Sequence, residues 1–200
     1  MTAELFAALA AFALSTLFTP GPNNLMLMAS GANYGLRRTV PHLLGVALGF
    51  PLLAVAVGLG LAALIRAVPT MEVVLKAVAV AFLLWLAWKV ANAKPPGEAA
   101  GEGRPLTFAQ AVAFQWVNPK AWAMALGAMA AYAASGGAAR VLFVAAVFAG
   151  FGLGSATTWT VIGTQIRRVL STPARLKVFN WTMAALLVAS LVPILGTDLT

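Results

Sequence analysis

The sequence predicts an all-α polytopic membrane protein, with six transmembrane helices that form two inverted three-helix repeats. Three observations predict it: the composition, six long apolar segments, and helix-breaking residues at matching places in the first and fourth segments. Of the 200 residues, 62% are hydrophobic and 9% are charged, which is more apolar surface than a soluble domain of this length can bury. The apolar runs are continuous rather than alternating, so they favour membrane helices over membrane strands.

The composition also excludes several classes of protein and ligand. The chain has no cysteine, so disulfides, iron–sulfur clusters and thiolate metal sites are excluded, and we expect no cofactor and no metal. The formal net charge is +8, but the basic residues stand singly or in pairs between apolar segments and form no stripe for nucleic acid. They are better explained as determinants of topology in a lipid bilayer.

Six apolar segments follow one another along the chain. They are predicted at about 3–31, 39–65, 73–90, 106–134, 141–162 and 178–195. A helix needs about 20 apolar residues to cross the hydrocarbon core, so the third and sixth segments are slightly short, and the first and fourth are long, as broken helices would be. The hydrophilic stretch 92–105 is predicted as a cytoplasmic linker between a first repeat, 1–91, and a second repeat, 106–200.

Helix breakers interrupt two of these segments. The first contains Thr19-Pro20-Gly21-Pro22-Asn23-Asn24, and the fourth contains Gln115-Trp116-Val117-Asn118-Pro119-Lys120. Proline removes a backbone donor and clashes with the preceding turn, and backbone groups freed in lipid need internal partners or a wet cavity. Breaks at corresponding places of two halves indicate a transporter binding site. Three spans in each half give the halves opposite orientations.

Basic residues predict the orientation in the membrane. Nine lie in or beside the loops that follow the first, third and fifth segments: Arg37, Arg38, Lys89, Lys94, Arg104, Arg167, Arg168, Arg175 and Lys177. The opposite side has Arg66 and Arg140, with Lys76 one turn into the third segment. The side with nine is predicted to be cytoplasmic, which leaves both termini extracytoplasmic and agrees with an even number of spans.

Short motifs carry a family resemblance. They are Thr19-Pro20-Gly21-Pro22-Asn23-Asn24, the following Gly35-Leu36-Arg37-Arg38 and Gly45-Val46-Ala47-Leu48-Gly49, then Leu84-Trp85-Leu86-Ala87-Trp88-Lys89 and Phe114-Gln115-Trp116-Val117-Asn118-Pro119-Lys120. Together they resemble the LysE/RhtB family of amino-acid exporters over nearly the whole chain. The double asparagine after Pro22 is similar to that of cysteine and O-acetylserine exporters in the family.

The resemblance implies a secondary transporter of the bacterial cytoplasmic (inner) membrane. Such a protein exports small amino acids or their derivatives from the cytoplasm, with protons as partners in antiport and with alternating access. The alternative is an exporter or channel for a non-amino-acid solute or ion on the same superfamily fold. An enzyme is not expected, because the five acidic residues, Glu4, Glu72, Glu98, Glu102 and Asp198, all lie away from the centres of the spans.

The two breaks form the predicted substrate site. Interrupted helices present free N–H groups and free carbonyls, which an amino-acid zwitterion needs for its carboxylate and its ammonium. The predicted substrate-binding residues are Pro20, Gly21, Pro22, Asn23, Asn24, Gln115, Asn118, Pro119 and Lys120. Val117 and Asn118 are expected to end one half-helix, and Pro119 to begin the next. The alternative is a pair of structural kinks whose asparagines satisfy freed backbone groups.

Two residues are candidates for proton coupling, and one asparagine is expected to be structural. Lys120 is the only charge deep in an apolar segment, where it costs at least about 2.5 kcal/mol. It is expected to meet the substrate carboxylate or to couple protons; the alternative is snorkelling or a backbone carbonyl contact. His42, the only histidine, is the second candidate and is expected at the membrane interface. Asn180 is expected near the start of its helix.

Small residues recur on the unbroken spans and allow helices to approach closely. They are Gly45, Gly49, Gly58, Gly60, Gly150, Gly152 and Gly154. We expect them to pack helices within one protomer, with a homodimer interface as the alternative.

Overall fold

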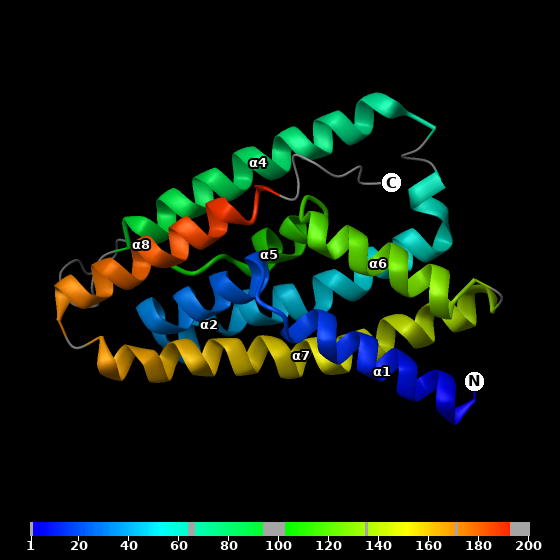
Figure 1. Cartoon of the computed structure of the whole chain (residues 1–200), viewed down its shortest axis with the longest axis horizontal. Coiled ribbons are helices and arrows are strands. Elements are labelled where there is room, and N and C mark those ends of the chain that lie inside the picture. The colour runs from blue at the N-terminus through cyan, green and yellow to red at the C-terminus, as the bar shows by residue number, and fades with distance from the viewer. Residues whose placement is uncertain (1, 64–66, 94–102, 135, 171, 193–200) are drawn as a thin grey trace.

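The structure, a computed structural model, describes residues 2–63, 67–93, 103–134, 136–170 and 172–192. The regular structure in these ranges is entirely helical. The helices are α1 (Ala3–Phe18), α2 (Pro22–Ala56), the π-helical turn η1 (Val57–Leu61), α4 (Pro69–Ala91), α5 (Phe108–Gln115), α6 (Pro119–Tyr132), α7 (Gly137–Val169) and α8 (Pro173–Ala189). Figure 1 shows α4 and α8 side by side along one edge, with α7 along the opposite edge. The all-helical class predicted from the sequence is confirmed.

A sharp turn divides α2 into two helical runs. Gly35 has φ 77° and ψ 169°, a conformation outside the helical region that glycine reaches because it has no Cβ. The Ser30 Oγ atom lies 3.1 Å from His42 Nδ1, which places the run before the turn beside the run after it. This turn therefore separates the first and second apolar segments, as the sequence predicts.

The lengths of the helices fit a membrane protein. Among the residues that the structure describes, three helical stretches are long and apolar enough to cross a membrane, namely Pro22–Leu61, Val73–Ala91 and Gly137–Val169. The last helix, α8, starts before the apolar segment predicted at 178, because Thr172 caps it: the Thr172 hydroxyl accepts a hydrogen bond from the Arg175 N–H at 3.3 Å. Its predicted end at 195, like most of the linker 92–105, lies outside the described residues.

Two clusters of buried apolar residues fill the interior. One joins α2, α4 and α8 through residues such as Leu27, Leu83 and Leu187. The other joins α1, α6 and α7 through residues such as Leu9 and Phe148, together with the end of α2. The two clusters lie one after the other along the molecule, and both breaks lie near their junction.

Glycines bring α2 and α7 into backbone contact. A Cβ atom on Gly31 would lie 2.2 Å from the Thr160 carbonyl oxygen, and one on Gly163 would lie 2.0 Å from the Met28 carbonyl oxygen. Small residues at such crossings let membrane helices approach closely. At these two positions α2 and α7 therefore lie directly against each other.

The predicted packing glycines have mixed outcomes. A Cβ on Gly45 would lie 2.5 Å from the Phe108 carbonyl oxygen, so this glycine packs α2 against α5, as Gly49 also does. At Gly60, Gly150 and Gly154, a Cβ would meet no atom of the described chain within 4 Å. The prediction of packing within one protomer is therefore wrong for these three positions.

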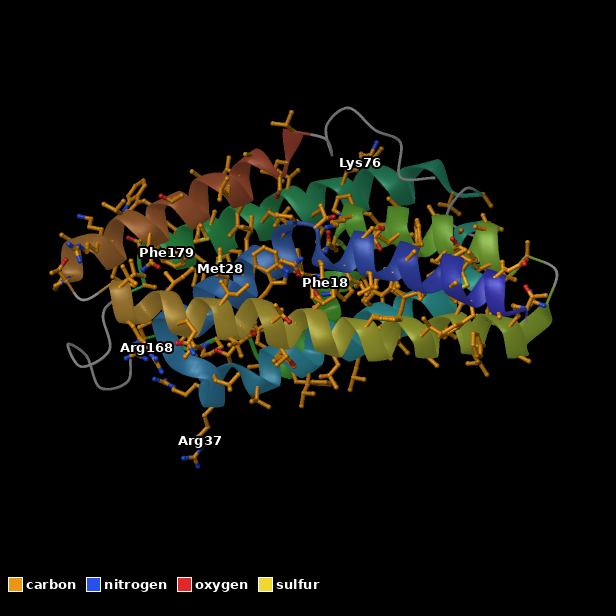
Figure 2. All side chains as sticks on the ribbon, turned by 60° about the horizontal axis from the view of Figure 1, so that its bottom comes forward. Phe18, Met28, Arg37, Lys76, Arg168 and Phe179 are labelled. Atoms are coloured by element: carbon orange, nitrogen blue, oxygen red, sulfur yellow. The ribbon has the colours of Figure 1, made fainter. Side chains whose placement is uncertain are left out.

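Basic side chains gather at one end of the molecule. Arg38 donates a hydrogen bond to the Gly103 carbonyl oxygen at 3.5 Å, which brings the α2 turn to the segment before α5. Figure 2 shows Arg37 and Arg168 at this same end. Arg140 instead lines a surface groove with Thr2, close to the N-terminus at the other end in Figure 1. Arg37 and Arg168 therefore lie at one end of the long axis, and Arg140 lies at the other.

Candidate functional site

The first helix break lies at the position that the sequence predicts. α1 ends at Phe18, and Thr19 follows it with an extended backbone of φ −63° and ψ 133°. α2 begins at Pro22, where the missing N–H of proline costs nothing because first-turn donors have no helical partner. Three residues between the two helices, 19–21, therefore make the break.

Side chains from other helices satisfy the carbonyls that end α1. Asn24 Nδ2 donates to the carbonyl oxygens of Leu17 and Thr19, at 2.8 and 2.9 Å. Ser155 Oγ on α7 also donates to the Leu17 oxygen, at 2.8 Å. Lys120 Nζ on α6 donates to the Thr19 oxygen at 2.7 Å. The last turn of α1 is thus tied to α2, α6 and α7.

The second break separates α5 from α6 and differs from the prediction at two residues, Val117 and Asn118. Asn118 does not end α5; it caps α6, and its Oδ1 atom accepts a hydrogen bond from the Lys120 N–H at 3.2 Å. An asparagine side chain suits this position because it satisfies a helix-start donor. Pro119 occupies the first turn of α6, as expected. The sequence interpretation erred by assigning Val117 and Asn118 to the preceding helix, because that helix ends at Gln115 and Val117 lies in the turn that follows it.

The two breaks face each other and are joined by hydrogen bonds. Asn23 Nδ2 donates to Gln115 Oε1 at 2.9 Å, and Gln115 Nε2 donates back to Asn23 Oδ1 at 3.1 Å. The bond from Lys120 to the Thr19 carbonyl is a second link. Gly21 leaves the space that the lysine occupies, since a Cβ there would lie 2.9 Å from Lys120 Cδ.

A cavity of about 40 Å³ lies beside these contacts. Its polar lining comprises Thr16, Asn23, Asn24, Asn118, Lys120 and Ser155, and its apolar lining includes Val46, Phe50, Met124 and Phe148. Residues of both buried clusters contribute, so the cavity lies at their junction. This volume holds a few water molecules, and a larger solute therefore requires the lining side chains to separate.

Most of the predicted binding residues lie at this cavity, and the rest support the breaks. Gly21, Asn23, Asn24, Asn118 and Lys120 line it. Gln115 contacts it through Asn23, whereas the three prolines shape the chain without lining it. The sequence interpretation missed Thr16 and Ser155, because a small hydroxyl residue inside an apolar helix gives no local signal.

Lys120 is only partly buried and has one hydrogen-bond partner for its ammonium in the described residues, the Thr19 carbonyl oxygen. In this conformation the Lys120 ammonium contacts a backbone carbonyl, which the sequence analysis named as the alternative to a role in substrate binding or proton coupling. Lys120 is also one of the residues that line the cavity.

Two residues are buried against expectation. His42 is 1% exposed, rather than interfacial, because the second run of α2 folds back over the first. Asn180 is 0% exposed and lies about two turns inside α8, which begins at Pro173. Asn180 and Asn33 exchange two hydrogen bonds, at 2.7 and 3.0 Å. A buried amide pair of this kind joins residues too far apart in sequence for a local pattern to predict.

Apolar helices long enough to cross a bilayer, and two facing breaks beside a small cavity with polar groups in its wall, define a polytopic membrane protein of the transporter class. The family model described as LysE type translocator matches residues 14–199. The chain therefore belongs to the LysE type translocator family, as its motifs predict, and is a transporter rather than an enzyme.

Curated relatives extend this finding. The chain is 28% identical over 190 residues to the cysteine/O-acetylserine efflux protein of Klebsiella pneumoniae subsp. pneumoniae, a match that covers 94% of this chain and 95% of the relative. It is 34% identical over 123 residues to the protein of the same name from Escherichia coli strain K12, covering 60% of this chain and 61% of the relative. No solved structure matches the chain significantly.

Proposed function

We propose that the chain is a secondary transporter of the bacterial cytoplasmic membrane that exports small amino acids or their derivatives by proton antiport with alternating access. The observation that carries this proposal is the pair of facing breaks, joined by the Asn23–Gln115 amides and by the Lys120–Thr19 bond. An ammonium, amides and carbonyls at one small cavity suit the two charges of a zwitterion. Relatives named for cysteine and O-acetylserine efflux support substrates of this size.

The same proposal includes the membrane arrangement. Residues 1–91 and 106–200 form two inverted repeats of three spans, each opening with a broken span, and 92–105 form a cytoplasmic linker. The gathering of basic residues at one end supports a cytoplasmic position for that end. Lys120 is the first candidate for proton coupling, with His42 second, because the residues that line the cavity include no carboxylate.

Counterflow in proteoliposomes tests the transport function. Vesicles are loaded with unlabelled cysteine, O-acetylserine, threonine, homoserine or leucine, and uptake of the labelled solute is followed with and without a pH gradient. We expect exchange of at least one small neutral amino acid and stimulation by the gradient. Absence of exchange for all of them, with folded protein, would favour a non-amino-acid solute.

Three substitutions test the site. Asn23→Ala, Asn118→Ala and Lys120→Ala each remove a polar group from the cavity lining, and we expect each to abolish exchange while folded protein remains in the membrane. Thr158→Ala is the matched control, because the exposed Thr158 hydroxyl donates only to its own helix, at the Gly154 carbonyl oxygen. Full exchange in all three variants would refute the site.

A further inference from the structure

A second cavity lies at the basic end of the molecule. Its volume is about 30 Å³, and its polar lining comprises Ser30, Asn33, Tyr34, His42, Lys89 and Arg104. These residues come from the two runs of α2, the end of α4 and the segment before α5. The cavity between the breaks has none of them in its lining, so the two cavities are separate.

His42 leaves one hydrogen-bonding atom of this cavity wall without a partner. Its Nδ1 atom lies 3.1 Å from Ser30 Oγ. Its Nε2 atom is buried and has no hydrogen-bond partner in the described part of the chain. Buried polar atoms are nearly always satisfied, and His42 is one of the residues that line the cavity, so its unpartnered nitrogen supports a ligand at this wall. When the Ser30 hydroxyl donates to Nδ1, the ring hydrogen lies on Nε2 and makes it a donor.

Lys89 and Arg104 add two positive charges to the same wall. Neither is paired with a carboxylate in the ranges that the structure describes. The Lys89 ammonium lies over the Trp85 ring, 5.3 Å from its centroid, a weak contact that a stronger anionic partner can replace. The wall has two cations and no carboxylate, so the charge of a fitting ligand is negative.

We propose that this cavity is a second binding site, which takes the carboxylate group of the exported substrate at the basic end before the substrate reaches the breaks. It rests on the export function proposed above. His42, Lys89 and Arg104 are the donors. A volume of about 30 Å³ admits a carboxylate group rather than a whole amino acid, so the remainder of the substrate stays at the rim.

Tryptophan fluorescence of the purified full-length chain in neutral detergent tests the site directly. Acetate and glycine are titrated at constant ionic strength, with ethylamine as the probe that lacks a carboxylate. We expect a saturable change with acetate and glycine and none with ethylamine, because binding draws the Lys89 ammonium away from Trp85. Trp85→Phe should remove most of this signal.

Substitutions then assign the donors. Lys89→Met and Arg104→Gln should each weaken acetate binding about tenfold or more, as loss of a charge-assisted hydrogen bond predicts. Lys89→Arg keeps the charge and should preserve binding. His42→Leu removes the donor, whereas His42→Gln places an amide donor near the same point and should bind more tightly than the leucine variant.

Two results would overturn the proposal. In the first, Lys120→Met weakens acetate binding while Lys89→Met does not, which assigns the carboxylate to the cavity between the breaks. In the second, phosphatidylglycerol vesicles give the fluorescence change and acetate gives none, which assigns the cavity to lipid phosphate. Because these titrations need no transport, they fail or succeed independently of counterflow.

In counterflow, Lys89→Met should raise the KM about tenfold when the substrate is supplied from the basic side, with little change in kcat.

Discussion

Gly21 and Lys120 act as a pair at the first break. The lysine side chain packs directly against Gly21. A Cβ atom added to Gly21 would lie 2.9 Å from Lys120 Cδ and 3.1 Å from Lys120 Nζ. Gly21→Ala should therefore displace the ammonium from the Thr19 carbonyl without unfolding the protein, since a lysine side chain is flexible. Loss of a charged hydrogen bond of about 1.5 kcal/mol predicts about tenfold slower exchange, measured by counterflow. Gly150→Ala, at an open position, is the control and should exchange normally.

The Asn33–Asn180 pair is a second residue-scale feature that can be tested. Asn180→Leu removes two hydrogen bonds to Asn33 and leaves the buried amide of Asn33 partly unsatisfied. We expect a loss of about 1–2 kcal/mol in the free energy of unfolding, measured by thermal or denaturant unfolding in detergent. Asn33→Leu combined with Asn180→Leu should cost less than the sum of the single changes, because no unpaired amide remains. A strictly additive double variant would contradict this account.

At the scale of helices, the crossing of α2 and α7 depends on Gly163. A Cβ there would lie 2.0 Å from the Met28 carbonyl oxygen, and backbone cannot move aside as a side chain can. Gly163→Ala should therefore push the helices apart and cost about 1–3 kcal/mol, the usual range for overpacking, with a lower melting temperature in detergent. Gly154→Ala on the same helix meets open space and should leave the melting temperature unchanged. Equal melting temperatures for the two variants would refute the close crossing.

Helix breaks and helix packing differ in how far the sequence predicts them. Proline and asparagine act on their own backbone, so the break before Pro22 and the start of α6 at Pro119 follow from local chemistry. The packing role of a glycine depends on which face of its helix meets a neighbour, which is a property of the tertiary arrangement. For this reason Gly163 was missed and Gly154 was wrongly predicted to pack. The sequence thus predicted the two breaks, but their partner on α7, Ser155, emerged only from the fold.

At the scale of the whole molecule, two small cavities occupy successive positions along the bundle. The cavity of about 30 Å³ lies among the basic residues, and the cavity of about 40 Å³ lies at the junction of the two buried clusters. Neither volume accommodates an entire amino acid. In the alternating-access cycle proposed above, the helices around each cavity separate in turn, and amide pairs such as Asn23–Gln115 are contacts that such a motion would break.

The proposed orientation can be tested cleanly because the chain has no native cysteine. Ala3, at the start of α1, and Lys177, in the second turn of α8, are both exposed, and five of the proposed spans lie between them. Figure 1 shows α1 and α8 reaching opposite ends of the molecule. In intact cells a membrane-impermeant maleimide should label Ala3→Cys and leave Lys177→Cys unlabelled, and both should react once the membrane is permeabilised. The reverse pattern would invert the orientation. Labelling of both sites in intact cells would place them on one side of the membrane and contradict the six-span arrangement.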